Sequence, residues 1–117
     1  MTKFYYLKSC STCIKILKTL NLPSDAVLQN IKSEPITEAQ LEEMKALAGS
    51  YEALFSKRAQ LYKSMNLKAQ TLSETDYKNY ILEHYTFLKR PVTIHNNSIF
   101  IGNTAKVTEA TKLALQA

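Results

Sequence analysis

Cys10 and Cys13 are the only two cysteines of the chain and stand three residues apart. They follow the short apolar run Phe4–Leu7 and precede an amphipathic run that starts at Ile14. A strand, a Cys-x-x-Cys pair and a helix in this order form the layout of a thiol redox site. The unpaired amides and the partial positive charge at the start of a helix favour thiolate over thiol.

Two arginines stand out among the basic residues. Of fifteen Lys and Arg side chains, only Arg58 and Arg90 are arginine. Arginine binds planar or tetrahedral oxyanions through paired hydrogen bonds, and lysine does not replace it in that role. Arg58 and Arg90 are therefore candidate anion-binding residues, with two ordinary surface arginines as the alternative interpretation.

The overall composition indicates one globular domain. The chain has 117 residues, 45% of them hydrophobic and 21% charged, which suits a single core. The net charge of +5 is spread along the chain without a Lys/Arg block, so we expect anionic substrates or acidic partners rather than nucleic acid. No apolar run is long enough for a membrane span, and no signal peptide is evident. We therefore expect a cytoplasmic protein, in which a Cys-x-x-Cys pair stays reduced.

Hydrophobic periodicity predicts the order β-α-β, a helical region, then β-β-α. The predicted strands span residues 3–7, 25–31, 91–94 and 98–101, and the predicted helices span 12–20, 37–48, one or two short helices in 51–65, 73–84 and 104–115. The first two strands should be parallel through a right-handed crossover, and the last two should form a hairpin turning at His95-Asn96-Asn97.

This order predicts an α/β protein with a thioredoxin-like (glutaredoxin-like) arrangement, in which helices pack on a small mixed four-stranded sheet. We expect residues 1–117 to form a single domain. Its core would comprise about 1–34 and 86–117, and an all-helical insertion would span about 35–85.

Five short segments resemble the arsenate reductase–Spx family when they are taken together in this order. They are Cys10-Ser-Thr-Cys13, Asn30-Ile31-Lys32-Ser33-Glu34-Pro35, Ser56-Lys57-Arg58, Leu88-Lys89-Arg90-Pro91-Val92 and Ile101-Gly102. The resemblance covers essentially the whole chain. It implies a thioredoxin fold with an all-helical insertion.

The resemblance implies distinct roles for the residues around the thiols. Cys10 would be the nucleophile, with Ser11 and Thr12 beside the bound substrate at the helix start. Cys13 would resolve a mixed disulfide or adduct on Cys10, since the spacing suits disulfide geometry.

Two alternatives remain for Cys13. It could be a small buried hydrophobic residue. It could also be part of a zinc half-site, for which only His84 and His95 remain as further ligands, without finger-like spacing.

The resemblance also implies that Pro91 follows a cis peptide bond and faces the cysteine. Arg90 would then sit beside Cys10, where it contacts an oxyanion or stabilises the thiolate. Arg58 resembles the insert arginine of the Spx branch and could reach the same anion. A trans proline at the start of an edge strand is the alternative for Pro91.

The chain departs from the arsenate reductase pattern at three positions. Asn103 stands where that branch has a third anion-binding arginine, and Tyr6 stands where it has a histidine. Cys13 is present where that branch has no second cysteine. Within the Spx pattern, the insert glycine has no secure equivalent, because Gly49 is near but offset.

Two functions are expected from these features. The first is a thiol-dependent oxidoreductase, with an oxyanion or a disulfide as substrate, no bound cofactor or metal, and glutathione, glutaredoxin or thioredoxin as external reductant. The second is a redox-sensing regulator of the Spx kind that binds the C-terminal domain of the RNA polymerase α subunit.

Overall fold

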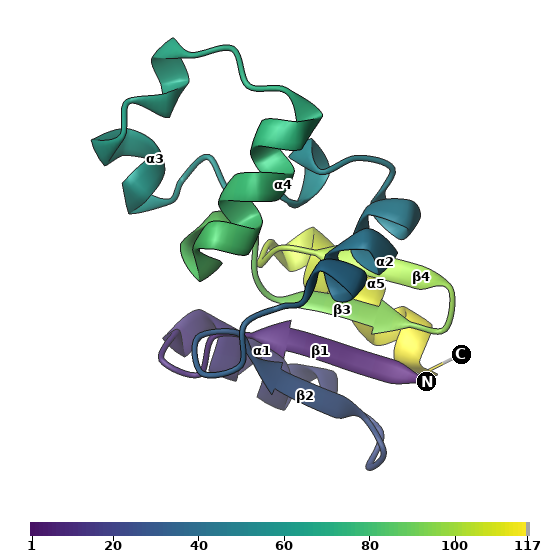
Figure 1. Cartoon of the computed structure of the whole chain (residues 1–117). Helices are drawn as coiled ribbons and strands as arrows, with labels where there is room; N and C mark the ends of the chain where they lie inside the picture. Colours follow the sequence, from purple (N-terminus) through teal and green to yellow (C-terminus); the bar gives the residue numbers. More distant parts are fainter. Residues whose placement is uncertain (117) are drawn as a thin grey trace. The chain divides into compact units, whose positions relative to one another are not determined.

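A computed structural model describes residues 1–116 of the chain. The chain divides into two compact units (Figure 1), which are described separately. The thiol unit comprises residues 1–34 and the segment from Arg90 onwards, and the insert comprises residues 35–89.

The thiol unit is built on a four-stranded sheet in the order β2-β1-β3-β4. The strands are β1 (Thr2–Tyr6), β2 (Val27–Asn30), β3 (Val92–His95) and β4 (Ser98–Ile101). The β1 and β2 strands are parallel, and the β1–β3 and β3–β4 pairs are antiparallel. The predicted mixed four-stranded sheet is thereby confirmed.

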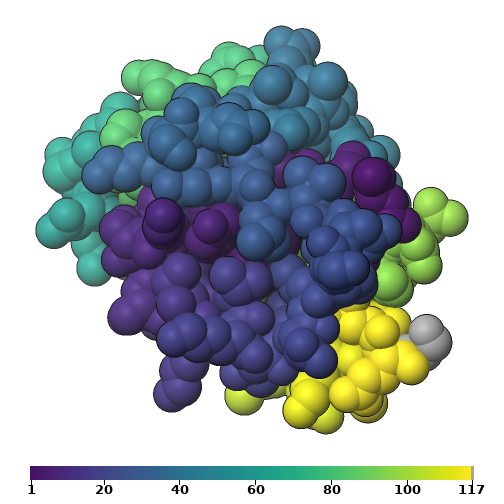
Figure 2. All heavy atoms as spheres, turned by 90° about the horizontal axis from the view of Figure 1, so that it is seen from below, coloured from purple at the N-terminus to yellow at the C-terminus, as the bar shows by residue number. Residues whose placement is uncertain are grey.

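Two helices cover one face of this sheet, α1 (Ser11–Leu20) and α5 (Ala105–Gln116). They contact each other, and Figure 2 shows the yellow α5 beside the purple and blue N-terminal segment. Phe4 is fully buried and packs with Ile16 and Leu20 of α1, while Leu115 of α5 adds to the same cluster. Burial of Phe4 thus fixes β1 against the helix that carries the thiols.

The second strand is shorter than the predicted segment 25–31. It begins at Val27 because the N–H of Ala26 donates to the carbonyl of Pro23 at 3.0 Å, in a turn. It ends at Asn30, whose carbonyl accepts the N–H of Glu34 at 2.9 Å and starts the next turn. As an edge strand it leaves Val27 46% exposed.

The hairpin also differs in detail from its prediction. The turn consists of Asn96 and Asn97 alone, and Asn96 adopts a positive φ of 56°, which asparagine tolerates. His95 was expected in the turn but belongs to β3, where it pairs with Ser98. Its Nδ1 lies 2.7 Å from the hydroxyl of Thr2, so the side chain links β3 to β1.

The insert is helical throughout its regular structure. Its elements are α2 (Glu38–Ala48), η1 (Glu52–Leu54), α3 (Gln60–Ser64), η2 (Leu67–Ala69), α4 (Glu74–Glu83) and η3 (Tyr85–Phe87). Both longer helices begin with a capping box, at Thr37 and at Ser73. Within residues 1–116, no helix combines the length and the apolar character that crossing a membrane requires.

Aromatic side chains form the centre of the insert. The ring of Phe55 stacks on that of Phe87, with ring centroids 5.3 Å apart, and its centroid lies 4.8 Å from that of the Tyr77 ring. The insert continues past residue 85 to Lys89, because the N–H of Lys89 donates to the carbonyl of Leu54 at 2.8 Å. Phe55 also forms a β-bridge with Leu88.

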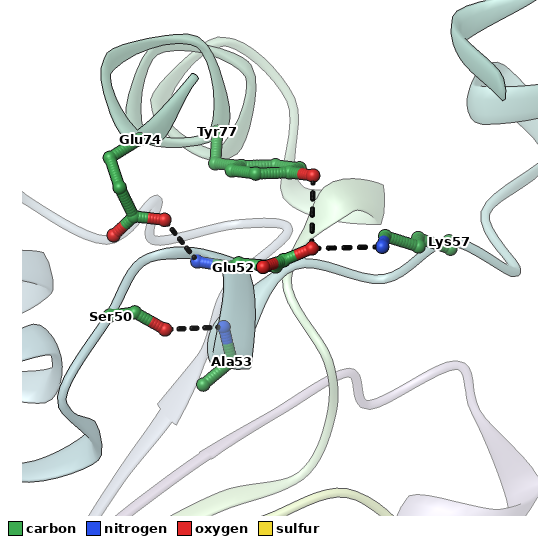
Figure 3. Close-up of polar contacts among 6 residues, drawn as sticks. All are labelled: Ser50, Glu52, Ala53, Lys57, Glu74 and Tyr77. Atoms are coloured by element: carbon green, nitrogen blue, oxygen red, sulfur yellow. Dashed lines mark hydrogen bonds and ion pairs between the residues drawn. The ribbon is translucent and has the colours of Figure 1, made fainter. Parts of the chain in front are cut away.

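Two carboxylates hold the segment around η1 (Figure 3). Glu74 accepts the N–H of Glu52 at 3.1 Å, as Figure 3 shows. It also accepts the N–H of Tyr51 at 2.7 Å. Glu52 in turn accepts from the Tyr77 hydroxyl at 3.2 Å and from the Lys57 ammonium at 3.0 Å. These contacts attach α4 to η1 and to the segment that leads to Arg58.

Candidate thiol site

Cys10 occupies the N-cap position of α1. Its backbone is extended, with φ −91° and ψ 112°, and its carbonyl accepts the N–H of Ile14 at 3.1 Å. Its own N–H donates to the carbonyl of Leu7 at 2.9 Å, so a tight turn joins β1 to the helix. The half-exposed thiol of Cys10 therefore stands beside the unpaired amides of the first helical turn.

These amides make Cys10 acidic. Burial by itself would raise the pKa of the Cys10 thiol, but several groups outweigh it and lower the pKa below its ordinary value. They are the backbone amides of Cys13 and Thr12, a hydrogen bond from the Cys13 thiol, and the positive charge of Arg90. Cys10 is consequently the thiol better suited to act as a nucleophile.

Cys13 lies in the opposite environment. Its side chain is 1% exposed, and burial raises the pKa of its thiol to about 11. The neighbouring Cys10 raises it further, while the Leu7 backbone and Arg90 oppose the change. Cys13 thus stays a protonated thiol that donates to Cys10.

Arg90 and Pro91 enter the site from the start of β3. Their peptide bond is cis, as the resemblance implied. Because β3 runs antiparallel to β1, with Val92 opposite Tyr5, Arg90 lies at the edge of the sheet where β1 leads to Cys10. The carbonyl of Pro91 accepts the N–H of Gly102 at 2.9 Å. This hydrogen bond links the segment before β3 to the residue that follows β4.

Ser11 and Thr12 form the exposed first positions of α1. The backbone N–H of Thr12 contributes directly, since it helps to lower the pKa of Cys10. For Thr12, the part that acts on the thiolate is therefore the main chain. A substrate anion at this position would meet the same amides.

Arg58 is the predicted site residue that belongs to the insert. It lies in an exposed turn after Ser56 and before α3. The preceding Lys57 is paired with Glu52 at 3.0 Å. The anion-binding role of Arg58 stays a prediction.

Asn30 supports the site. It begins one of the five segments that resemble the arsenate reductase–Spx family, but no role was predicted for it from the sequence. Its side-chain oxygen accepts the N–H of Lys8 at 3.2 Å and, more weakly, the N–H of Lys32 at 3.5 Å. It thereby joins the turn before Cys10 to the turn after β2. An asparagine at the end of a strand, where side chains commonly bond to nearby backbone, is the sequence signal for this role.

Two of the three departures from the arsenate reductase pattern, Tyr6 and Asn103, lie in different surroundings. Tyr6 is partly buried and packs against the core beside Phe4, with ring centroids 5.5 Å apart. Asn103 is exposed and follows Gly102, whose φ of 99° lies in the left-handed region. Thr104 then caps α5 by accepting the N–H of Val107 at 3.2 Å.

Both histidines have contacts elsewhere. Nδ1 of His84 accepts the N–H of Thr86 at 3.1 Å, at the start of η3, and His95 contacts Thr2. Residues 1–116 hold no cluster of three or more His, Cys, Asp or Glu side chains that could bind a metal ion. The zinc alternative therefore has no ligand set in this part of the chain.

Comparison with known proteins agrees with this geometry. The model of the ArsC family matches residues 5–111. The chain belongs to the ArsC family. The global transcriptional regulator Spx 2 of Bacillus cereus is 28% identical over 105 residues, which span 87% of this chain and 79% of the regulator.

Solved structures show the same fold. An arsenate reductase from Vibrio cholerae has a TM-score of 0.77 at 20% identity, covering 97% of this chain and 96% of its own. A putative ArsC family related protein from Bacteroides fragilis has a TM-score of 0.78 at 22% identity, covering 94% and 96%. The thioredoxin-like fold expected from the sequence is thus confirmed.

Proposed function

We propose that this ArsC family member is a thiol-dependent oxidoreductase whose nucleophile is Cys10. The observation that carries the proposal is the contrast between two adjacent thiols. The amides of the α1 start and Arg90 lower the pKa of Cys10, whereas burial raises that of Cys13 to about 11. Cys10 is therefore the sulfur suited to nucleophilic attack as a thiolate. Cys13 stays protonated and donates a hydrogen bond to it.

The reaction with a disulfide follows from this arrangement. The Cys10 thiolate attacks one sulfur of the substrate, a Cys10–substrate disulfide forms, and the other half leaves as a thiolate. Cys13 then loses its proton and attacks Cys10, which releases the second half and leaves a Cys10–Cys13 disulfide. Glutathione with glutaredoxin, or thioredoxin, reduces that disulfide and restores both thiols.

An oxyanion such as arsenate could enter the same site. Arg90 and the first amides of α1 would bind its charge, and Arg58 would be the second arginine. Asn103 and Tyr6 replace the further arginine and the histidine of the arsenate reductase pattern. Since each missing charged hydrogen bond costs about 1.5–3 kcal/mol, we expect disulfides to react better than arsenate.

The test is NADPH consumption by the purified protein with a glutathione–glutaredoxin or a thioredoxin regenerating system. Hydroxyethyl disulfide and arsenate are supplied in separate assays. The rate of each regenerating system alone is subtracted, because glutathione, glutaredoxin and thioredoxin themselves reduce small disulfides. We expect the wild type to add to that rate with the disulfide, Cys10→Ser to add nothing, and Cys13→Ser to lose the added rate in the thioredoxin system. Equal rates for the wild type and Cys10→Ser with both substrates would contradict the proposal.

A second function is favoured by the likeness to Spx regulators and by the exposed segment that contains Arg58. In this proposal the chain binds the C-terminal domain of the RNA polymerase α subunit, and the Cys10–Cys13 pair senses oxidation. A pull-down with that domain should retain the wild type and lose Arg58→Ala, whereas Lys63→Ala is the matched control. If neither oxidised nor reduced protein is retained, the regulator function fails. Both functions assume a cytoplasmic setting in which the pair is normally reduced.

A further inference from the structure

The two units of the chain differ sharply in charge. The thiol unit contains eight basic and three acidic side chains, which gives it a net charge of +5. The insert contains seven of each and is neutral. The net charge of the whole protein therefore belongs to the unit that carries the thiols, and its first acidic residue is Asp25.

Two lysines of the thiol unit stand at the edge of the sheet that leads to Cys10. Lys8 follows β1 and Lys32 follows β2, and these strands are parallel, so both residues lie at the same edge. Their backbone amides share the side-chain oxygen of Asn30 as acceptor. Arg90 enters the same edge from β3.

The charges of these lysines are available to a ligand. Both side chains are exposed, and among residues 1–116 neither ammonium group forms an ion pair. Glu34 is the nearest carboxylate along the chain, two residues after Lys32, and it is exposed. The segments that follow β1 and β2 thus carry an excess of positive charge at the edge of the sheet from which the chain leads to Cys10.

We propose that Lys8 and Lys32 make Cys10 selective for disulfides that carry carboxylates. This inference rests on the proposed function and adds the substrate class. The lysines attract the anionic disulfide and raise its local concentration at the thiolate. The exchange is the step already described, in which the Cys10–substrate bond forms, the substrate disulfide breaks and a carboxylate-bearing thiolate leaves.

The test compares three small aliphatic disulfides of different charge, namely dithiodiglycolate (anionic), hydroxyethyl disulfide (neutral) and cystamine (cationic). A Cys13→Ser background retains the mixed disulfide on Cys10, which acid quenching and intact mass spectrometry then count. We expect Lys8→Gln/Lys32→Gln to slow the anionic reagent about fourfold at low ionic strength, about twofold for each lysine. The cationic reagent should accelerate by a similar factor, and both effects should fade near 0.5 M salt, roughly where screening is complete.

The ratio of anionic to cationic rates isolates this effect from any change in Cys10 acidity, which alters all three rates alike. Lys63→Gln/Lys68→Gln in the insert removes the same charge from exposed positions and should leave the ratio nearly unchanged. Glu34→Gln should shift the ratio in favour of the anionic reagent. An unchanged ratio in Lys8→Gln/Lys32→Gln, or an equal change in the insert control, overturns the inference. Absence of any reaction with hydroxyethyl disulfide in the wild type would instead overturn the proposed function.

Discussion

The two thiols should differ strongly in their reaction with iodoacetamide, although they are separated by a single helical turn. Alkylation requires the thiolate, and its rate follows the ionised fraction of each sulfur. The amides of the α1 start favour the Cys10 thiolate, while burial disfavours the Cys13 thiolate. Mild alkylation of the native protein should therefore modify Cys10 alone.

The magnitude follows from the pKa of Cys13. With a pKa of about 11, close to one molecule in 10⁴ carries the Cys13 thiolate at pH 7. An ordinary thiol with a pKa of about 8.5 is ionised to about 3% at the same pH. Cys13 should thus react about 300-fold more slowly than an ordinary cysteine, before the further hindrance from its 1% exposure.

Both cysteines fall in the tryptic peptide Ser9–Lys15, and fragment ions distinguish modification of Cys10 from that of Cys13. Time courses at each pH give separate rates for the two positions. The Cys10 alkylation rate should level off at a lower pH than that of an ordinary thiol, because the pKa of Cys10 is lowered. Arg90→Gln should move this plateau to higher pH, because it removes a positive charge that lowers the pKa. The Cys13 rate should rise about tenfold for each pH unit and reach no plateau before pH about 11.

Two results would refute this reasoning. One is modification of Cys13 before Cys10, or at a comparable rate, in the native protein. The other is a Cys13 rate that levels off at the pH of an ordinary thiol, because burial would then not control its ionisation. Unfolded protein in denaturant is the control, in which both positions should react alike.

Three further outcomes are expected. Because the folded-state pKa of Cys13 is raised, its contribution to stability is complete below the unfolded pKa and is lost as pH rises towards about 11. Chemical denaturation should show the free energy of unfolding falling by up to about 3 kcal/mol more over this range in the wild type than in Cys13→Ala. Phe4→Ala should lower the free energy of unfolding by about 3–5 kcal/mol, since the ring is fully buried against Ile16 and Leu20. A decrease of less than about 1 kcal/mol in the free energy of unfolding, measured by thermal or chemical denaturation, would contradict that packing. Asn30→Ala should slow Cys10 alkylation, because the turn between β1 and Cys10 loses the acceptor of the Lys8 amide. Asn30→Asp keeps that acceptor and should restore much of the rate. Equal rates in the two variants would show that the acceptor does not position this turn.

Much of the fold could be predicted because its local signals are strong. Apolar runs bounded by turn residues marked the strands. The predicted helices 37–48 and 73–84 have the right starts because Thr37 and Ser73 cap them through contacts that are close in sequence. The errors lay at element ends. His95 was predicted in the hairpin turn but pairs with Ser98 in β3. Asparagine tolerates a positive φ, as at Asn96, but this property does not say how many residues the turn contains. The length of β2 depended on which amides the neighbouring turns use.

The sequence by itself determined the reactive pair, its place between a strand and a helix, and the family resemblance, because these depend on residue types at short spacing. Tertiary structure decided how the two thiols divide their roles. Burial of Cys13, the amides beside Cys10 and the charge of Arg90 come together only when β1, α1 and β3 meet at one edge of the sheet. The same folding brings Lys8 and Lys32 to one asparagine from positions more than twenty residues apart. Spacing along the chain cannot report these effects, since a pKa depends on what surrounds the sulfur in space.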